Sequence, residues 1–398
     1  MKQLRQSPGD PAFVQNPYPF YAAARTEGHL HHWSDYGMVA AFSHEAVSSL
    51  LRDKRMGREV PTEMAQPPRP ELAAFDAIEA HSMLEIEPPR HTRLRGLVLR
   101  AFTSRAIAAL AGDIEALCHE LVDGFPAEPF DLLPTYCTEI PLRTIARLLG
   151  VPEDMCPNLL AWSHTMVATY QAEMPPGTAE TANRASAEFT AYLTDFIEHR
   201  RQAMQESPPD DLITRLIAVQ QSDGDRLSME ELIATCVLLL NAGHEATVHS
   251  LGNGIKALVE HGFGANCLTD ETVAGTVEEI LRYDPPLHMF QRYAYEDFEA
   301  FGHAFKRGDQ VALLLGAANR DPAVWPDPDR FDPARKPLTH SAFGGGAHFC
   351  VGAPLARLEM QIALQVLFRR CPDLSLAQPP IYADSYHFHG LSALMVKA

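Results

Sequence analysis

The feature that most constrains the fold is a long helical stretch, Ser228 to Glu260, that no proline interrupts. Its start carries a capping-box pattern, in which the hydroxyl of Ser228 and the carboxylate of Glu231 each accept a hydrogen bond from a backbone N–H group. About thirty residues at ~1.5 Å each form a rod of roughly 50 Å, which is long enough to cross a whole domain. The middle of this stretch is apolar almost all round, so we expect a buried helix.

Four residues interrupt the apolar middle of this predicted helix: Asn241, Gly243, His244 and Glu245. A glycine inside a helix costs ~1 kcal/mol relative to alanine, and buried polar groups need partners or a function. His244 and His249 look like part of a zinc-binding H-E-x-x-H motif, but their spacing places them about 140° apart around a helix. They cannot share a metal ion from one face, so this segment needs another explanation.

The remainder of the chain has mostly helical periodicity. We expect helices over residues 104–124, 140–150, 180–206, 210–221, 271–283 and 353–370, and strands over 37–42, 292–297 and 308–315. The prediction is a mainly α fold with a small β part, arranged as one domain over residues 1–398.

Composition excludes several classes of protein. A net charge of −18 disfavours binding to nucleic acid or to anionic membranes. Seven scattered cysteines, never spaced C-x-x-C, argue against a disulfide framework or a zinc site and indicate reduced thiols. The sequence contains no long apolar stretch and its first residues do not resemble a secretory signal, so we expect a cytoplasmic protein with no membrane span.

One stretch departs from this acidic character. Residues 88–112 contain no acid, and they hold Arg90, Arg93, Arg95, Arg100 and Arg105. A local basic face on an acidic protein indicates an anionic ligand or an acidic partner. From spacing alone, a solvated helix face is an equally good interpretation.

The second informative stretch is "SAFGGGAHFCVGAPLARLE", in which the glycines Gly344 to Gly346 precede His348 and Cys350. It fits neither the dinucleotide-binding nor the Walker phosphate-binding pattern. A helix is predicted to begin after Gly352, with Pro354 in its first turn, and a helix N-terminus favours an ionised thiol. Glycines allow close approach to a large flat group, and His348 could pair with a carboxylate. Together these features describe a haem with an axial cysteine.

This loop resembles the haem-binding signature F-x-x-G-x-H/R-x-C-x-G of the cytochrome P-450 superfamily. The matching residues are Phe343, Gly346, His348, Cys350 and Gly352. Other segments, in the same order as in that superfamily, are similar to its remaining motifs: "HTRLR" with His91 and Arg95, "NAGHEAT" over residues 241–247, Glu279-x-x-Arg282, Arg292, and "PDRF" with Arg330. The resemblance covers nearly the whole chain and points to the soluble, bacterial-type, ferredoxin-dependent members.

The resemblance implies a P-450 fold with haem b between the long helix and the cysteine loop. It implies that Cys350 is the axial ligand of the iron. The residues implied to bind the haem propionates are His91, Arg95, Arg292 and His348, and those implied to lie at the cofactor are Phe343, Gly346, Gly352, Ala242 and Gly243. The implied structural cluster consists of Glu279, Arg282 and Arg330.

The resemblance also implies the activity and the partners. The protein would be a monooxygenase that activates O₂ with two electrons from a ferredoxin and its ferredoxin reductase. It would insert oxygen, by hydroxylation or epoxidation, into a small or medium, mostly apolar organic molecule. The ferredoxin would dock near the Arg90–Arg105 stretch and the cysteine loop.

One departure from the family pattern lies in the oxygen-activation segment Glu245, Ala246 and Thr247. The family usually has threonine where this chain has Ala246, and Thr247 is rotated about 100° away on a helix. Proton delivery would then depend on Glu245 with ordered water, or on a hydroxyl group of the substrate. A peroxide-driven or oxidative-coupling enzyme stays an alternative, and a non-enzymatic haem sensor is disfavoured because it would not need this acid.

The substrate itself is not readable from the sequence. Family geometry implies that Met83-Leu84, Leu239 to Ala246, Leu287 to Phe290 and Phe388 line the pocket. Each of these segments could equally be ordinary hydrophobic core.

Overall fold

The structure, a computed structural model, describes residues 1–398 except 66, 68, 171–173, 205–208, 223–226, 337 and 387. The chain divides into two compact units. The unit that we call the sheet unit comprises Met1–Met64, Ile114–Glu139 and Ala246–Ala398. The unit that we call the helical unit comprises Ala65–Asp113 and Ile140–Glu245. The interpretation of residues 1–398 as one domain stays a prediction.

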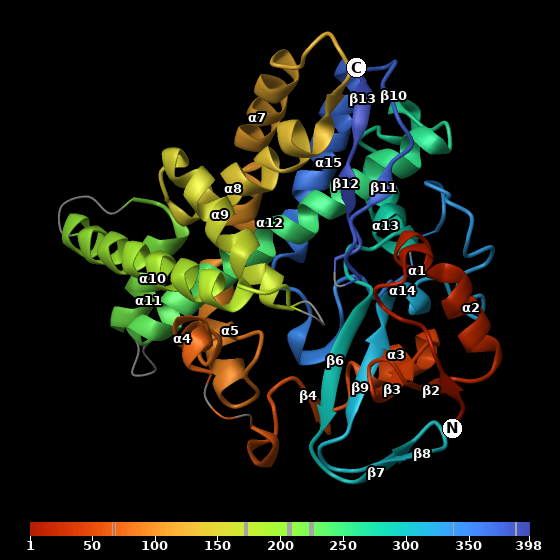
Figure 1. The fold of residues 1–398 in the computed structure, drawn as a ribbon. Helices are drawn as coiled ribbons and strands as arrows, with labels where there is room; N and C mark the ends of the chain where they lie inside the picture. Colours follow the sequence, from red (N-terminus) through yellow and green to blue (C-terminus); the bar gives the residue numbers. More distant parts are fainter. Residues whose placement is uncertain are drawn as a thin grey trace. The chain divides into compact units, whose positions relative to one another are not determined.

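The sheet unit is built on a six-stranded sheet of order β1-β2-β3-β9-β6-β4 (Figure 1). In that order the strands are Gln3–Leu4, Leu30–Trp33, Met38–Ala41, Gln310–Leu314, Met289–Ala294 and Met56–Gly57. Smaller sheets pair β10 (Ser375–Leu376), β13 (Met395–Lys397) and β5 (Phe130–Asp131), then β11 (Ile381–Tyr382) with β12 (Leu391–Ala393), and β7 (Phe298–Ala300) with β8 (His303–Phe305).

The sheet is buried on both faces, which explains the continuous apolar run of β9. Val311 and Leu313 point into one hydrophobic cluster and Ala312 and Leu314 into another, because neighbouring side chains of a strand alternate between faces. The helices of this unit are α1 (Pro11–Gln15), α2 (Tyr18–Thr26), α3 (His44–Leu50), α13 (Val273–Tyr283), α14 (Leu315–Ala318), α15 (Ala353–Arg370) and most of α7 (Ala111–Asp123).

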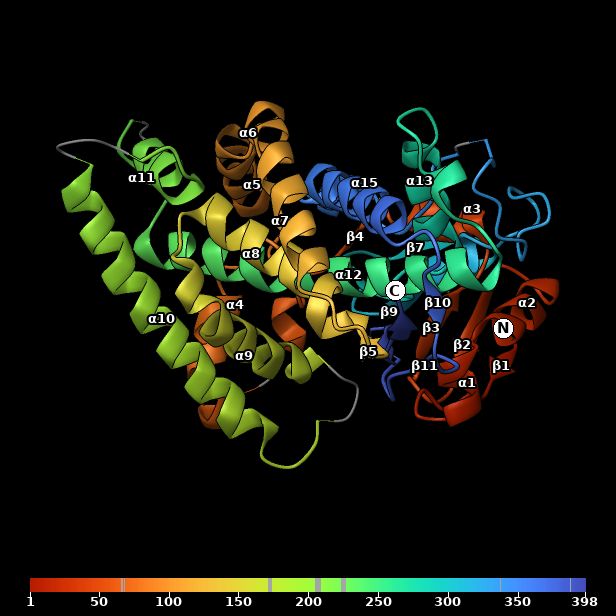
Figure 2. The same ribbon diagram turned by 90° about the horizontal axis from the view of Figure 1, so that it is seen from above.

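The helical unit contains α4 (Ala73–Glu79), α5 (Arg90–Ala101), α6 (Ser104–Ala109), α8 (Glu139–Leu149), α9 (Cys156–Val167), α10 (Thr178–Ala203) and α11 (Leu212–Ser222). Helices α9 and α10 lie side by side (Figure 2). The ring of Trp162 on α9 stacks on that of Phe189 on α10, with centroids 5.0 Å apart.

The long predicted helix is confirmed as α12, Met229–Glu260, and the boundary between the two units falls inside it. Its capping box is also confirmed. The Ser228 N–H donates to Oε2 of Glu231 at 3.0 Å, and the Glu231 N–H donates to Oγ of Ser228 at 3.1 Å.

Several sequence predictions differ from the structure in their bounds, and three of them by more than two residues or in the number of elements. The expected helix 104–124 is two helices, α6 and α7, and the expected strand 292–297 is β6, which begins and ends three residues earlier. The expected helix 180–206 is α10, and its last two expected residues lie outside the described part of the chain. In the part of the chain that the structure describes, no helix has both the length and the apolar character needed to cross a membrane.

The predicted Glu279–Arg282 pair is buried on α13. Arg282 is 1% exposed, and its Nε donates to Oε2 of Glu279 at 2.7 Å. Its Nη1 also donates to the carbonyl oxygens of Asn319 (3.0 Å) and Pro328 (2.8 Å). A buried ion pair needs such extra hydrogen bonds to offset the cost of removing both charges from water.

The predicted role of Arg330 in this cluster needs a correction. The Arg330 side chain is 69% exposed and lies 3.8 Å from Asp332, so only its carbonyl oxygen takes part, accepting a bond from Arg282. Arg335 supplies the second guanidinium, with Nε 3.1 Å from Oε2 of Glu279. The turn at Asp327, which has a φ of 45°, precedes the segment that carries both arginines.

The backbone of the cysteine loop is fixed by close contacts with β6 and with the end of α3. Gly344 and Gly346 have φ values of 70° and 69°, a region that side chains disfavour. A Cβ atom on Gly346 would lie 2.3 Å from the carbonyl oxygen of Leu51, and one on Gly344 would lie 2.9 Å from the Phe290 ring. Protein contacts therefore already require these two glycines.

We expect Gly346→Ala to destabilise the protein more than Gly262→Ala. Gly262 has nearly the same φ, 70°, but has open space around it, so it isolates the cost of the backbone conformation, about 1–2 kcal/mol. The clash with Leu51 should add about 1–3 kcal/mol to the loss of unfolding free energy in Gly346→Ala. Chemical denaturation measures both losses, and equal values would show that the close approach to Leu51 carries no cost.

Candidate functional site

Cys350 is a half-buried thiol at the start of α15, two residues before its N-cap Gly352. Its N–H donates to the carbonyl oxygen of Phe343 at 3.1 Å, which closes the glycine loop. The positive end of a helix favours an ionised sulfur there. All seven cysteines are free, and burial raises the pKa values of the Cys118 and Cys236 thiols to about 12. Those two thiols are therefore poor ligands compared with Cys350.

One carboxylate, Glu278 on α13, holds both flanks of the cysteine loop. It accepts hydrogen bonds from Nε of Arg357 (2.6 Å), which follows the loop, and from Nε2 of His340 (3.1 Å), which precedes it. Burial would raise the pKa of Glu278, but the bonds from Arg357 and His340 outweigh burial and lower the pKa to about 2. The Arg357 guanidinium also lies over the Phe343 ring, 4.5 Å from its centroid. Sequence reasoning missed Glu278, because nothing in its local pattern distinguishes it from Glu279.

The other predicted cofactor residues of the sheet unit lie on the loop and on β6. His348 is half-buried in the short 3₁₀ turn Gly346–His348. Arg292 on β6 is 2% exposed, and its Nη1 donates to the Gln291 carbonyl at 2.8 Å. The ring of Phe290 connects the two elements, since it contacts Gly344 and lies 5.9 Å from the Arg292 guanidinium.

The helical unit holds the remaining predicted residues on α5 and α12. His91 is buried and Arg95 is half-buried on α5. On α12, residues 232–240 are almost all buried, whereas the small residues Ala242 and Gly243 and the acid Glu245 are accessible. Ala242 is exposed, as a residue beside a flat cofactor would be, whereas a Cβ atom on Gly243 would lie 3.4 Å from the Ile145 side chain of α8.

Glu245 lies between two histidines. Its Oε2 is 3.3 Å from Nε2 of His164 on α9 and 3.3 Å from Nε2 of His244. Hydrogen bonding to Glu245 raises the pKa of His164. Sequence reasoning did not identify His164 as a partner of Glu245, because α9 was not among the predicted helices.

The boundary between the two units falls between Glu245 and Ala246, so Ala246 and Thr247 of the oxygen-activation segment belong to the sheet unit. Ala246 is half-buried, and its carbonyl oxygen accepts a bond from Oγ of Ser250 at 2.8 Å. Thr247 is 4% exposed, so its side chain faces protein rather than an open surface.

A second buried cluster ties two predicted pocket segments together in the sheet unit. Asp284 accepts a bond from the Tyr18 hydroxyl at 2.7 Å and lies 3.3 Å from Nε2 of His389. Nδ1 of His288 lies 3.0 Å from the Tyr21 hydroxyl. This network fixes the chain on both sides of Leu287 and next to Phe388, and both of these side chains are half-buried, as pocket-lining side chains would be.

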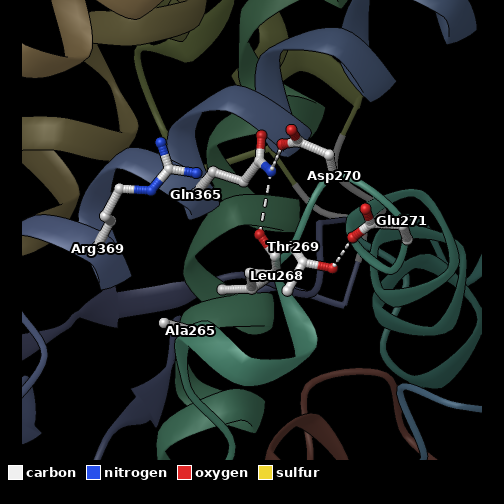
Figure 3. A pocket seen from close by; sticks show the side chains of 7 residues that line it. All are labelled: Ala265, Leu268, Thr269, Asp270, Glu271, Gln365 and Arg369. Carbon is white, nitrogen blue, oxygen red and sulfur yellow. Dashed lines mark hydrogen bonds between the residues drawn. The ribbon is translucent and has the colours of Figure 1, made fainter.

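Two surface hollows differ in character. A groove of about 700 Å³ runs along the basic face of α5 and is lined by Pro88, Pro89, Thr92, Arg93, Gly96, Leu97 and Arg100. A smaller hollow of about 270 Å³ lies beside α15 (Figure 3). In the smaller one, Gln365 already donates to the Leu268 carbonyl and to Asp270, at 3.0 and 2.9 Å, so its polar groups bind one another.

Comparison with known proteins supports the same interpretation. The sequence profile described as "Cytochrome P450" matches residues 160–262 and 271–378. The chain is 36% identical to "Polyketide biosynthesis cytochrome P450 PksS" of Bacillus subtilis (strain 168), covering 96% of this chain and 94% of that protein. It is 37% identical to "Vitamin D(3) 25-hydroxylase" of Pseudonocardia autotrophica, covering 96% and 94%.

Solved structures agree with these relatives. P450BioI in complex with an acyl carrier protein has a TM-score of 0.89 and 32% identity, covering 97% of this chain and 99% of that chain. The B. subtilis PksS structure has a TM-score of 0.87 and 34% identity, covering 98% and 99%.

The residues present fit the cofactor of that family. An accessible thiol at a helix N-terminus is the donor that haem-thiolate iron requires, and a buried arginine lies on the neighbouring strand. The fold, the profile match and the full-length relatives lead to one conclusion. The chain belongs to the cytochrome P450 family and is a haem-thiolate monooxygenase.

Proposed function

We propose that this P450 inserts oxygen into a small or medium, mostly apolar organic molecule by hydroxylation or epoxidation, with Cys350 as the iron ligand. The observation that supports this proposal most directly is the accessible thiol of Cys350 at the N-terminus of α15. Contacts on both sides of the cysteine loop hold the loop in place. The bound haem-thiolate group supplies O₂ activation, because the thiolate increases electron density at the iron. Several relatives have consistent names, among them "Mycinamicin IV hydroxylase/epoxidase".

The roles of the other residues follow from their chemistry. Arg292 and His91, each 2% exposed, are basic side chains of the kind that pairs with carboxylates, and the two haem propionates are carboxylates. Arg95 and His348 complete this proposed set of propionate partners. Phe343, Gly346 and Gly352 shape the loop, and Ala242 and Gly243 place small residues of α12 at the cofactor. The same proposal places the protein in the cytoplasm, which its free thiols favour.

We expect Cys350→Ala to abolish the thiolate-type spectrum of the reduced CO complex, because no other ligand would give the iron thiolate character. Cys267→Ala is the matched control, since Cys267 is the other half-buried thiol and lies in the turn Ala265–Cys267. The control should keep the spectrum of the unchanged protein. A thiolate-type spectrum in Cys350→Ala would refute Cys350 as the ligand.

Proton delivery is proposed to run through Glu245, with ordered water or a substrate hydroxyl group in place of the missing threonine. Glu245 is the accessible acid of the segment, whereas Thr247 faces protein. An Ala246 side chain can neither donate nor accept a hydrogen bond, so the proton must come from elsewhere.

We expect Ala246→Thr to change the ratio of product formed to electrons consumed. The test substrate is chosen from a ligand panel by the shift of the Soret band on binding. If a substrate hydroxyl delivers the proton, the variant should gain most with an analogue that lacks this hydroxyl. Unchanged coupling and an unchanged rate with both compounds would contradict the proposal.

The electron donor is proposed to be a ferredoxin, reduced by its reductase and docked at the α5 groove and the cysteine loop. The groove is lined by Arg93 and Arg100, and Arg90 and Arg105 are exposed nearby on this acidic protein. Complementary charge steers such an acidic partner to its site. The acyl carrier protein bound to P450BioI makes a carrier protein a second candidate for this surface.

We expect product to form only with O₂ and reduced ferredoxin, and Arg100→Glu to raise the KM for ferredoxin because it reverses a charge in the groove. Arg184→Glu is the control, since Arg184 is an exposed arginine of α10 in the same unit. Steady-state kinetics measure both variants. Efficient turnover with peroxide and no ferredoxin would instead support the peroxide-driven alternative, and equal KM values for both variants would exclude docking at the groove.

A further inference from the structure

The two histidines beside Glu245 have no role in the proposed reaction. His164 comes from α9, and His244 and Glu245 come from α12 in the same unit. Nε2 of each histidine lies 3.3 Å from the same oxygen, Oε2 of Glu245, and the three atoms all lie within 4.8 Å of one another. A single point in space is therefore close to all three ligand atoms.

The spacing suits a transition metal. Zinc binds imidazole nitrogen at about 2.0–2.1 Å and carboxylate oxygen at about 2.0–2.2 Å, so two ligands of a tetrahedral site stand about 3.4 Å apart. The two measured separations of 3.3 Å match this edge length.

The hydrogen bonding of His244 also supports a metal site. Its Nδ1 lies 2.9 Å from the carbonyl oxygen of Leu240, which can only accept, so Nδ1 carries the hydrogen. In the neutral ring, Nε2 then presents a lone pair toward the Glu245 carboxylate. Nε2 is buried and makes no hydrogen bond, and the side chain is 1% exposed. A metal ion between these two electron-pair donors would bind both, and a backbone carbonyl behind the ring is the usual support of a metal-binding histidine.

A second histidine-rich cluster among the described residues does not have this character. In the group formed by Asp284, His288 and His389, tyrosine hydroxyls already occupy the ligand atoms, at 2.7 Å from Asp284 and 3.0 Å from His288. That group is fully buried, whereas the His164 side chain is 55% exposed and leaves a path for an ion.

We propose that His164, His244 and Glu245 form a binding site for a divalent transition metal of the zinc type. Three protein ligands leave one position for water, the arrangement of an open zinc site. The ligand pair comes from two helices, so it differs from the His244–His249 pair that the helix geometry excludes. The consequence for turnover rests on the proposed function: a bound metal would occupy the Glu245 carboxylate and inhibit oxygen insertion.

Zinc titration of the haem-loaded protein by calorimetry tests the site. We expect one zinc ion per chain, with affinity reduced about tenfold or more in His164→Ala. The isosteric Glu245→Gln should also weaken binding. The control is His199→Ala, an exposed histidine of α10 whose Nδ1 bonds to the Asp195 carbonyl, and it should bind zinc like the unchanged protein. Equal affinity in His164→Ala and the unchanged protein would overturn the proposal.

Turnover measurements with zinc distinguish a failure of the proposed metal site from a failure of the proposed proton role of Glu245. Zinc should inhibit product formation by the unchanged protein, a chelator should reverse this, and His164→Ala should be less sensitive, while the CO spectrum stays constant. If zinc binds through His164 but leaves turnover unchanged, the metal site is supported and the proposed proton role of Glu245 is refuted.

Discussion

The structure around the cysteine depends on one buried guanidinium. Arg282 is hydrogen-bonded to Glu279 and to the Asn319 carbonyl, and the Asn319 side chain accepts the N–H of Ser341 at 2.7 Å, where the cysteine loop begins. Removing one partner of such a buried pair costs about 3–5 kcal/mol, because the other charge stays buried. The loop is therefore placed by electrostatic pairing at its base, and its own backbone only completes the shape.

Two neighbouring carboxylates on α13 hold different parts of the chain around the cysteine. Glu279 binds the buried Arg282 and the half-buried Arg335, and Glu278 binds His340 and Arg357 on the two sides of the loop. Because consecutive residues of a helix point about 100° apart, one helix turn reaches two different parts of the chain. The thiol of Cys350 is thus held by contacts that do not involve the sulfur.

The structural features that depend only on residues close together in the sequence were predicted from local sequence patterns. The capping box, the long helix and the start of α15 after Gly352 depend on nearby residues and were predicted correctly. Contacts between distant residues were not predictable. Whether Arg330 or Arg335 reaches Glu279 depends on the path of an irregular segment, and the approach of His164 to Glu245 depends on how α9 packs on α12. The glycine loop was interpreted through its cofactor, whereas Leu51 and Phe290 already require Gly346 and Gly344.

The parallel pairing of β3 with β9 has a consequence for how the protein is made. Val39 pairs with Val311, and Leu51 contacts the loop at Gly346, so β3 can pair with β2 on one edge but lacks β9 on its other edge until most of the chain has left the ribosome. At about 5–20 residues per second, synthesis of the intervening roughly 270 residues takes on the order of 15 s to a minute. During that time β3 exposes an unpaired strand edge and apolar side chains, the features that make a nascent chain prone to aggregation.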